Sequence, residues 1–263
     1  MIIDAHTHIY PDKIAIKASH GISDFYNIRV LYDGTVGKLL EIGNSAGIDK
    51  YVVHSVATAP EQVASINGFI ASAVAANPDR FIGFATLHPD SKCIAEDVDR
   101  AIDMGLSGIK LHPDFQKFNA DSSNAMKIYE AIQGMLPLLI HTGDYRTEYS
   151  KPYRILNILK AFPTLDVIAA HLGGWSEWGT CAQELAQAGI YVDTSSSQGF
   201  MEPSRVRELI DIFGIDKVFF GSDYPMWDAV EELDMLSKIL LTQEEKEKVL
   251  HLNFERLMGK YNK

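Results

Sequence analysis

Short apolar runs alternate with longer amphipathic segments along the whole chain. The short runs are rich in Val, Ile, Leu and Phe and are apolar almost continuously, which is typical of parallel strands covered by helices. We expect eight strands, at Ile2–His6, Lys50–Val56, Phe81–Leu87, Gly108–His112, Leu136–His141, Val167–His171, Tyr191–Thr194 and Val218–Ser222.

The segments between these strands repeat apolar residues at helical spacing, and glycine or proline follows several of them, as at helix ends. A further helix begins after Thr242, where Glu245 completes a capping box. We expect helices at Val36–Ala46, Glu61–Ala76, Ile94–Met104, Asn124–Gly134, Tyr153–Ala161, Cys181–Ala188, Ser204–Phe213, Val230–Leu240 and Gln243–Met258.

Eight strands, each followed by a helix, predict an α/β protein with a (β/α)8 TIM barrel and an extra C-terminal helix. A doubly wound open sheet is the alternative, because periodicity does not show whether a sheet closes. No Gly-x-Gly-x-x-Gly turn follows a strand, which disfavours a dinucleotide-binding version of that sheet. No linker divides residues 1–263, so we expect one domain. The segment Tyr10–Thr35 breaks the rhythm, and we expect a long loop there, either a lid or a surface insertion.

Composition restricts the class of protein. The chain has 263 residues, 46% hydrophobic and 22% charged, as in an ordinary globular protein. Its net charge of −11, without a Lys/Arg run, argues against a nucleic-acid partner. No apolar run reaches membrane-spanning length, and no signal-peptide pattern opens the sequence. Two cysteines without CxxC spacing fit a reducing compartment, so we expect a cytoplasmic protein. We also expect that it acts on a small molecule.

Histidines at the ends of apolar strands are the main candidates for chemistry. In His6-Thr7-His8, the two imidazoles of an extended segment point to the same side and can chelate one metal ion. His141 and His171 also close apolar strands, and Asp223 follows the eighth. Barrels place active sites at this end of their strands. Buried ionisable groups are costly unless paired or metal-bound, so the recurrence favours a shared metal site.

These segments resemble the amidohydrolase superfamily, and within it the branch that includes aminocarboxymuconate-semialdehyde decarboxylase. The resemblance extends over nearly the whole chain and is carried by Ile3-Asp4-Ala5-His6-Thr7-His8, the His141 and His171 strand ends, and Gly221-Ser222-Asp223-Tyr224-Pro225. It implies that the metal ligands are His6, His8, His141 and Asp223.

In the single-metal members, the counterpart of His171 stays off the metal, where it polarises substrate or moves protons. Three nitrogen donors and a carboxylate suit a divalent metal, with Zn²⁺ preferred, although imidazole also binds Fe, Mn and Ni. Such an ion lowers the pKa of bound water to about 7. Asp223 would accept the proton of that water and pass it to the leaving group.

Lys110 leaves the number of metal ions open. In two-metal relatives a strand-four lysine is carboxylated and bridges the ions, and Lys110 stands at the matching position. We favour one ion, with Lys110 either facing a substrate carboxylate or forming a buried ion pair. His112 shares the strand face of Lys110; it binds substrate or orients a loop, with equal support for each.

Two residues after strand ends are candidates for substrate binding. Trp175 lies just past the sixth strand, where aromatic side chains form pocket walls or simply cover the barrel. Arg146 follows His141 closely and is a candidate anchor for a substrate anion.

The ligand set suits more than one reaction. We prefer hydrolysis of a small amide, lactone or ester by metal-activated water, because the chain is short beside the larger decarboxylases of the branch. The alternative is non-oxidative decarboxylation of an aromatic or unsaturated carboxylate on the same metal, with His171 helping to deliver the proton that replaces CO₂. A non-enzymatic barrel is disfavoured by the intact set of candidate ligands. Only fold analogy suggests a homo-oligomer.

Overall fold

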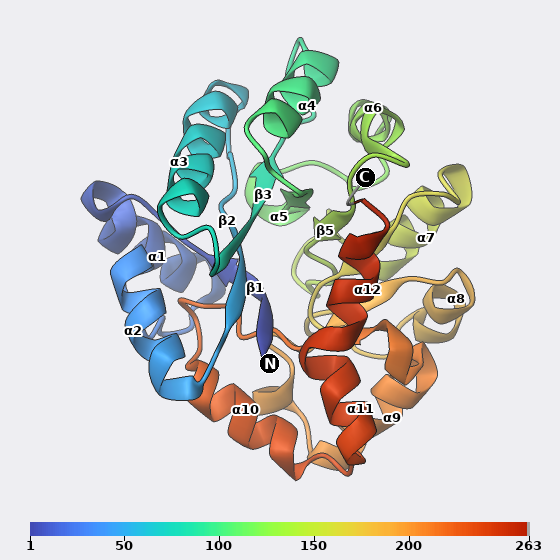
Figure 1. Ribbon diagram of the computed structural model, residues 1–263. Coiled ribbons are helices and arrows are strands. Elements are labelled where there is room, and N and C mark those ends of the chain that lie inside the picture. The colour runs from blue at the N-terminus through green and yellow to red at the C-terminus, as the bar shows by residue number, and fades with distance from the viewer. Residues whose placement is uncertain (262–263) are drawn as a thin grey trace.

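The computed structural model describes residues 1–261 and arranges eight parallel strands in the order of the sequence (Figure 1). Every strand residue except Lys50 and Ile82 is buried, because side chains on one face fill the barrel and those on the other lie under helices. The strands are β1 (Ile3–His8), β2 (Lys50–His54), β3 (Phe81–Thr86), β4 (Gly108–Leu111), β5 (Leu138–Ile140), β6 (Val167–Ala169), β7 (Tyr191–Asp193) and β8 (Val218–Phe219).

Hydrogen bonds between β1 and the segment that follows β8 bring the two ends of the sheet together. The Ala5 N–H donates to the Phe220 carbonyl at 2.8 Å, and the Asp223 N–H donates to the His6 carbonyl at 2.9 Å. The fold is therefore the (β/α)8 barrel predicted from the sequence, and the open-sheet alternative is excluded. The strands end one to three residues earlier than predicted at β2 to β8, so His112 and His141 directly follow a strand and His171 and Asp223 lie in the turns beyond one.

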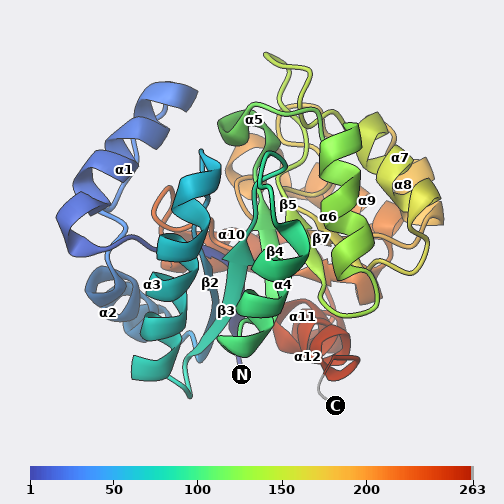
Figure 2. The same cartoon turned by 90° about the horizontal axis from the view of Figure 1, so that it is seen from above.

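The helices form a ring around the barrel (Figures 1 and 2). α2 has the predicted bounds, with Thr35 accepting the Lys38 N–H at its start and Gly47 left-handed at its end. In chain order, the ring consists of α2 (Val36–Ala46), α3 (Val63–Ala76), α4 (Ile94–Asp103), α6 (Ser123–Ile132), α7 (Pro152–Ala161), α8 (Ala182–Gln187), α9 (Pro203–Phe213) and α10 (Ala229–Lys238).

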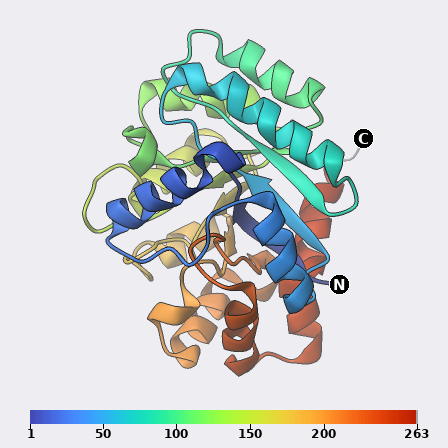
Figure 3. The same cartoon turned by 90° about the vertical axis from the view of Figure 1, so that its left-hand side faces the viewer.

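The predicted long loop after β1 is wrong over much of its length, because α1 occupies Asp12–Tyr26. Its buried residues are Ala15, Ser19 and Ile22, a single narrow stripe with a polar member. That stripe gives little helical periodicity in the sequence, and Gly21 weakens it further. Figure 3 shows α1 outside the ring of helices, and Figure 2 places it with α5 (Pro113–Gln116) at the end of the barrel opposite both termini.

The C-terminal helix closes the amino end of the barrel. It consists of α11 (Gln243–Glu247), a π-helical turn (Lys248–Leu252) and α12 (Asn253–Gly259), and the predicted capping box of Thr242 and Glu245 is present. Phe254 packs edge-on against Phe219 inside the barrel, with ring centroids 5.5 Å apart. This apolar plug leaves the carboxyl end as the open end. None of the helices within residues 1–261 is both long and apolar enough to span a membrane.

A buried carboxyl group on α10 makes the stability of the fold depend on pH. Glu232 is 2% exposed and accepts a hydrogen bond from the Gln198 amide at 2.7 Å. Burial raises the pKa of Glu232 from 4.5 to about 8. Between these pH values the folded state keeps a proton on Glu232 that the unfolded state has released. The free energy of unfolding therefore falls as pH rises from 4.5, and the contribution of the protonated Glu232 is lost as pH passes through 8.

We therefore expect Glu232→Gln to raise the melting temperature at pH 8.5 by roughly 3–8 °C, with a smaller gain at pH 5. The new amide keeps the hydrogen-bond acceptor and removes the cost of a buried charge. Thermal unfolding followed by circular dichroism measures the difference. The matched control is Glu231→Gln, since Glu231 is the exposed neighbour on the same helix. An equal gain at both pH values would contradict this reading.

Candidate functional site

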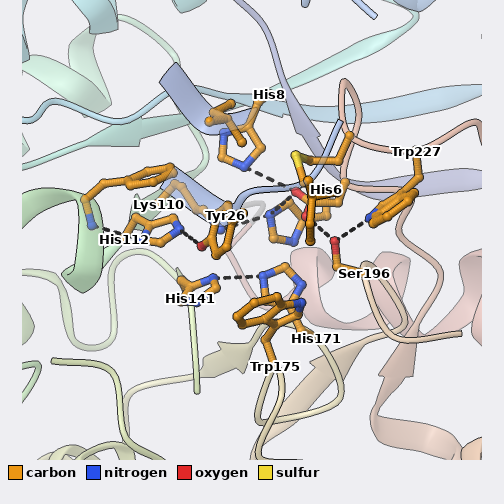
Figure 4. A pocket seen from close by; sticks show the side chains of 15 residues that line it. His6, His8, Tyr26, Lys110, His112, His141, His171, Trp175, Ser196 and Trp227 are labelled. Carbon is orange, nitrogen blue, oxygen red and sulfur yellow. Dashed lines mark hydrogen bonds and ion pairs between the residues drawn. The ribbon is translucent and has the colours of Figure 1, made fainter. Parts of the chain in front are cut away.

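The carboxyl end of the barrel encloses a small chamber of about 30 Å³. β1 supplies two histidines, β4 a lysine, and the turns after β5, β6 and β8 supply two histidines and an aspartate. Figure 4 shows that the histidines and the lysine among them, although far apart in the sequence, face one another. The chamber is lined by His6, His8, Tyr26, Lys110, His112, His141, His171, Trp175, Ser196, Asp223 and Trp227, together with Ile22, Ile28, Phe115 and Met226.

Two of these turns use a left-handed backbone that non-glycine residues rarely adopt. His171 and Asp223 both have φ of 61°. The cost of this conformation is offset by hydrogen bonds, because the His171 N–H donates to Asp193 Oδ1 at 3.1 Å and the Asp223 N–H is bound to β1. The chain thus reverses sharply after each strand and directs both side chains into the chamber.

Asp193 at the end of β7 sets the orientation of His6. The His6 Nδ1–H donates to Asp193 Oδ2 at 2.9 Å, which leaves the Nε2 lone pair directed into the chamber. Asp193 Oδ1 also accepts the Ser195 N–H at 3.1 Å. A carboxylate behind an imidazole in this manner is the usual support of a metal-binding histidine.

His141 and His171 are oriented by backbone carbonyls. His141 Nε2 donates to the Gly143 carbonyl at 2.8 Å, and His171 Nδ1 donates to the Ser195 carbonyl at 3.1 Å. Their remaining nitrogens, His141 Nδ1 and His171 Nε2, face each other at 2.9 Å across the chamber (Figure 4). Each ring therefore presents one nitrogen to the chamber, as His6 does.

Asp223 joins the two histidines of β1. Its Oδ1 lies 3.4 Å from His6 Nε2 and 3.5 Å from His8 Nε2, and its Oδ2 accepts the Ser196 hydroxyl at 2.5 Å. Burial raises the pKa of Asp223, but the neighbouring His6, His8 and His171 lower it more, so the net effect holds the pKa well below its usual range. Asp223 is therefore an ionised oxygen donor beside two imidazole nitrogens.

The chamber favours neutral imidazoles. Burial is the largest cause of the lowered pKa of every histidine in the set His6, His8, His112, His141 and His171. A neutral ring keeps the lone pair that binds a metal ion. The histidines are thus in the protonation state that ligands require.

Lys110 is fully buried, and its amine lies 3.0 Å from His6 Nε2. Burial lowers the pKa of Lys110 to about 8, although Asp223 and Asp193 act in the opposite direction. The lysine predicted from the sequence therefore lies in the chamber, where it donates to an imidazole and faces two carboxylates.

His112 and Trp175 both line the chamber, beneath the end of α1. The backbone N–H of Phe115 donates to His112 Nδ1 at 3.4 Å, which caps α5, and His112 Nε2 bonds the Tyr26 hydroxyl at 2.9 Å. Trp175 packs edge-on against Tyr26, with ring centroids 4.9 Å apart. These hydrogen bonds fit the loop-orienting alternative for His112, and its predicted contact with substrate stays a prediction.

Arg146 lies outside the chamber lining. Its guanidinium is paired with Asp144 at 2.6 Å and donates to the Phe25 carbonyl at 2.6 Å. It also lies over the rings of Phe25 and Tyr26, at 4.9 and 5.0 Å from their centroids. Arg146 thus stabilises the C-terminal end of α1 through Phe25 and Tyr26. Its predicted role in anion binding stays a prediction.

Sequence reasoning missed three polar contributors, Asp193, Ser195 and Tyr26. Asp193 is the last residue of an apolar strand, and Asp223 follows another. This similarity was the available signal for Asp193. Ser195 is one of several serines in a row, and Tyr26 belongs to the segment expected to be a loop, so neither stood out.

Several groups of side chains around the chamber have donors suited to a metal ion. Within residues 1–261, the ligand atoms of each group lie within 4.8 Å of one another. These groups are His6, His8 and His54; His6, His171 and Asp193; and His112, Asp114 and His141. The chain therefore has histidine and aspartate groups that could hold a divalent metal, while the choice of zinc is not established by them.

Comparison with known proteins gives one family and several similar structures. The family model described as Amidohydrolase matches residues 3–260. A 2,6-dihydroxybenzoate decarboxylase from Rhizobium is 16% identical, with a TM-score of 0.78, and the match covers 98% of this chain and 98% of that one. A 5-carboxyvanillate decarboxylase from Sphingomonas paucimobilis is 17% identical, with a TM-score of 0.73 and coverage of 98% of both chains.

A dihydroxybenzoic acid decarboxylase from a Polaromonas species has bound manganese and the inhibitor 2-nitroresorcinol. It is 16% identical, with a TM-score of 0.77, and the match covers 98% of this chain and 96% of that one. These three structures share the fold of this chain.

The preference for hydrolysis drawn from the sequence is wrong. It rested on a chain thought to be short beside the decarboxylases, whereas the matches cover 96–98% of the three decarboxylase chains described above. The three are named for decarboxylation of aromatic carboxylates, the reaction that the sequence analysis gave as its alternative.

The residues that resemble amidohydrolases in the sequence thus come together in the structure, at the place where a barrel carries its active site. The family match extends from β1 to the C-terminal helix, over 3–260 of 263 residues, and this chain belongs to the amidohydrolase family.

Proposed function

We propose that this protein is a metal-dependent decarboxylase of an aromatic or unsaturated carboxylate. The observation that carries the proposal is that His6, His8, His141 and Asp223 all line one buried chamber, where Asp223 Oδ1 lies 3.4 Å from His6 Nε2 and 3.5 Å from His8 Nε2. The other nitrogens of His6 and His141 are hydrogen-bonded, as in metal-binding histidines.

The donor set fits a divalent metal ion. Three neutral imidazoles and one carboxylate suit Zn²⁺, Mn²⁺ or Fe²⁺, and the manganese in the Polaromonas decarboxylase supports Mn²⁺ beside the expected Zn²⁺. We propose one ion per chain, held by His6, His8, His141 and Asp223. Lys110 is then a buried amine that donates to His6 Nε2 and feels the charges of Asp223 and Asp193, and no bridging second ion is needed.

Charge supports a carboxylate substrate. Asp223 is ionised and faces the amine of Lys110, so a divalent ion would leave the chamber with a net positive charge. Such an ion would supply a Lewis acid that can polarise a substrate carboxylate. The positive charge of the chamber would attract the substrate anion, whereas it would not hold the neutral product CO₂.

The reaction exchanges a carboxylate for a proton on carbon. A proton is added to the carbon that carries the carboxylate, the C–C bond breaks, and its electron pair restores the conjugated system as CO₂ leaves. We assign the transfer of this proton to His171 Nε2, which faces the chamber and would first take up a proton from solvent, because the proton of the neutral ring is on Nδ1 and is donated to the Ser195 carbonyl. Lys110 would hold the departing carboxylate, and His112 and Trp175 would contact the reacting end of the substrate.

The direct test is a panel of hydroxybenzoates and unsaturated dicarboxylates incubated with the Mn²⁺-loaded and Zn²⁺-loaded protein. We expect loss of a carboxylate from at least one acid, detected as CO₂ and as the decarboxylated product by liquid chromatography. Removal of the ion with a chelator should abolish this activity, and adding the ion back should restore it. Hydrolysis of esters, lactones or amides without any CO₂ release would contradict the proposal.

Asp193 should act on metal binding through His6. We expect Asp193→Asn to weaken metal binding about 10- to 100-fold. A carboxylate keeps the proton of His6 on Nδ1 and leaves Nε2 for the metal ion, and an amide does this less well. Isothermal titration with Mn²⁺ measures the change. The control is Asp211→Asn, because Asp211 forms an exposed ion pair with Arg207. Unchanged affinity in the Asp193 variant would refute its supporting role.

His171 should be needed for turnover but not for the metal ion. We expect His171→Asn to keep about one ion per chain and to lose at least about 100-fold in kcat, the usual effect of removing a proton-transfer group. Metal analysis and steady-state kinetics on the same preparation separate the two effects. If the variant loses the ion together with activity, His171 is a ligand instead.

A further inference from the structure

A second, much larger cavity lies next to the chamber, between α1 and the start of α3. Its volume is about 630 Å³, against about 30 Å³ for the chamber. Three residues line both spaces: His8, Ile22 and Phe115. The two spaces are therefore neighbours across these side chains, with His8 facing both.

The chamber by itself is too small for a substrate. A volume of about 30 Å³ has room for about two water molecules, since one occupies about 10–15 Å³ on this measure. Pockets that bind small molecules measure about 300–1,000 Å³, and the neighbouring cavity lies within that range. The reacting carboxylate fits the chamber, whereas the rest of the substrate requires the larger space.

The walls of the larger cavity indicate what it takes. Most of its lining is apolar or aromatic, including Ile14, Ile22, Phe25, Ile66, Phe69 and Phe115. Polar side chains lie mainly on the side of α3, where Gln62 accepts hydrogen bonds from Thr58. Lys17 is charged, and among the described lining residues there is no Asp or Glu, although the chain has a net charge of −11. The cavity therefore suits an apolar group attached to an acid.

We propose that the cavity between α1 and α3 binds an extended apolar substituent of the substrate, while the carboxylate enters the chamber. This inference rests on the proposed function and narrows its substrate class to aromatic or unsaturated acids with an apolar side chain of several carbons. α1 forms one wall through Ile14, Ala18 and Ile22, so this helix determines the preference for the substituent. Arg146 and Tyr26 hold its C-terminal end against the barrel.

The test compares the binding of benzoate and 4-hexylbenzoate to the Mn²⁺-loaded full chain by isothermal titration calorimetry. Each methylene group buried from water adds about fourfold in affinity, so burial of two or more gives at least about a tenfold preference for 4-hexylbenzoate. Ala18→Trp and Ser65→Trp place a large ring in the cavity from opposite walls and should remove this preference while benzoate binding is kept. The matched controls are His20→Trp on α1 and Ser72→Trp on α3, both exposed and outside the lining.

Preference for the longer acid in the wild type and both controls, and its loss in both cavity variants, is the expected result. Equal binding of the two acids to the wild type overturns the proposal, as does a preference that survives Ala18→Trp and Ser65→Trp. Because binding is measured without turnover, the two proposals fail separately. A length preference without CO₂ release from any acid contradicts only the decarboxylase function, and CO₂ release without a length preference contradicts only the cavity assignment.

Discussion

The site depends on the burial of many ionisable groups at one end of the barrel, away from water. A hydrogen bond to the second nitrogen of an imidazole buried there offsets part of the cost of its desolvation. Asp193 and the carbonyls of Gly143 and Ser195 bind those nitrogens for His6, His141 and His171. The same hydrogen bonds fix which nitrogen faces the chamber. The stability of the buried site and its ability to bind a cation thus have one origin.

The barrel explains why residues so distant in sequence meet. Parallel strands bring all their carboxyl ends to one rim, and the turns after β6 and β8 direct His171 and Asp223 inward from left-handed conformations. At the other end, Phe254 of α12 and its apolar neighbours fill the barrel interior. The open rim is covered from one side by α1, through Tyr26 and its contacts with His112 and Trp175.

The sequence predicted the strands, the barrel and the residues around the chamber because apolar periodicity and strand-end histidines are local signals. It did not predict α1, whose buried stripe of Ala15, Ser19 and Ile22 is too narrow to be distinguished from a loop. The sequence did not reveal the role of Asp193, because a supporting carboxylate can be identified only when the structure shows which imidazole it contacts. The reaction was misjudged because the ligand set is common to hydrolysis and decarboxylation.

The central claim is that one divalent ion is held between β1, β5 and β8. The most direct measurement is a crystal structure of the Mn²⁺-loaded protein with anomalous data at the manganese edge, together with metal analysis of the same sample. The account predicts one ion per chain and one anomalous peak, within about 2.5 Å of His6 Nε2, His8 Nε2, His141 Nδ1 and an oxygen of Asp223. A peak at another group, or protein that remains free of metal while it releases CO₂, would contradict it.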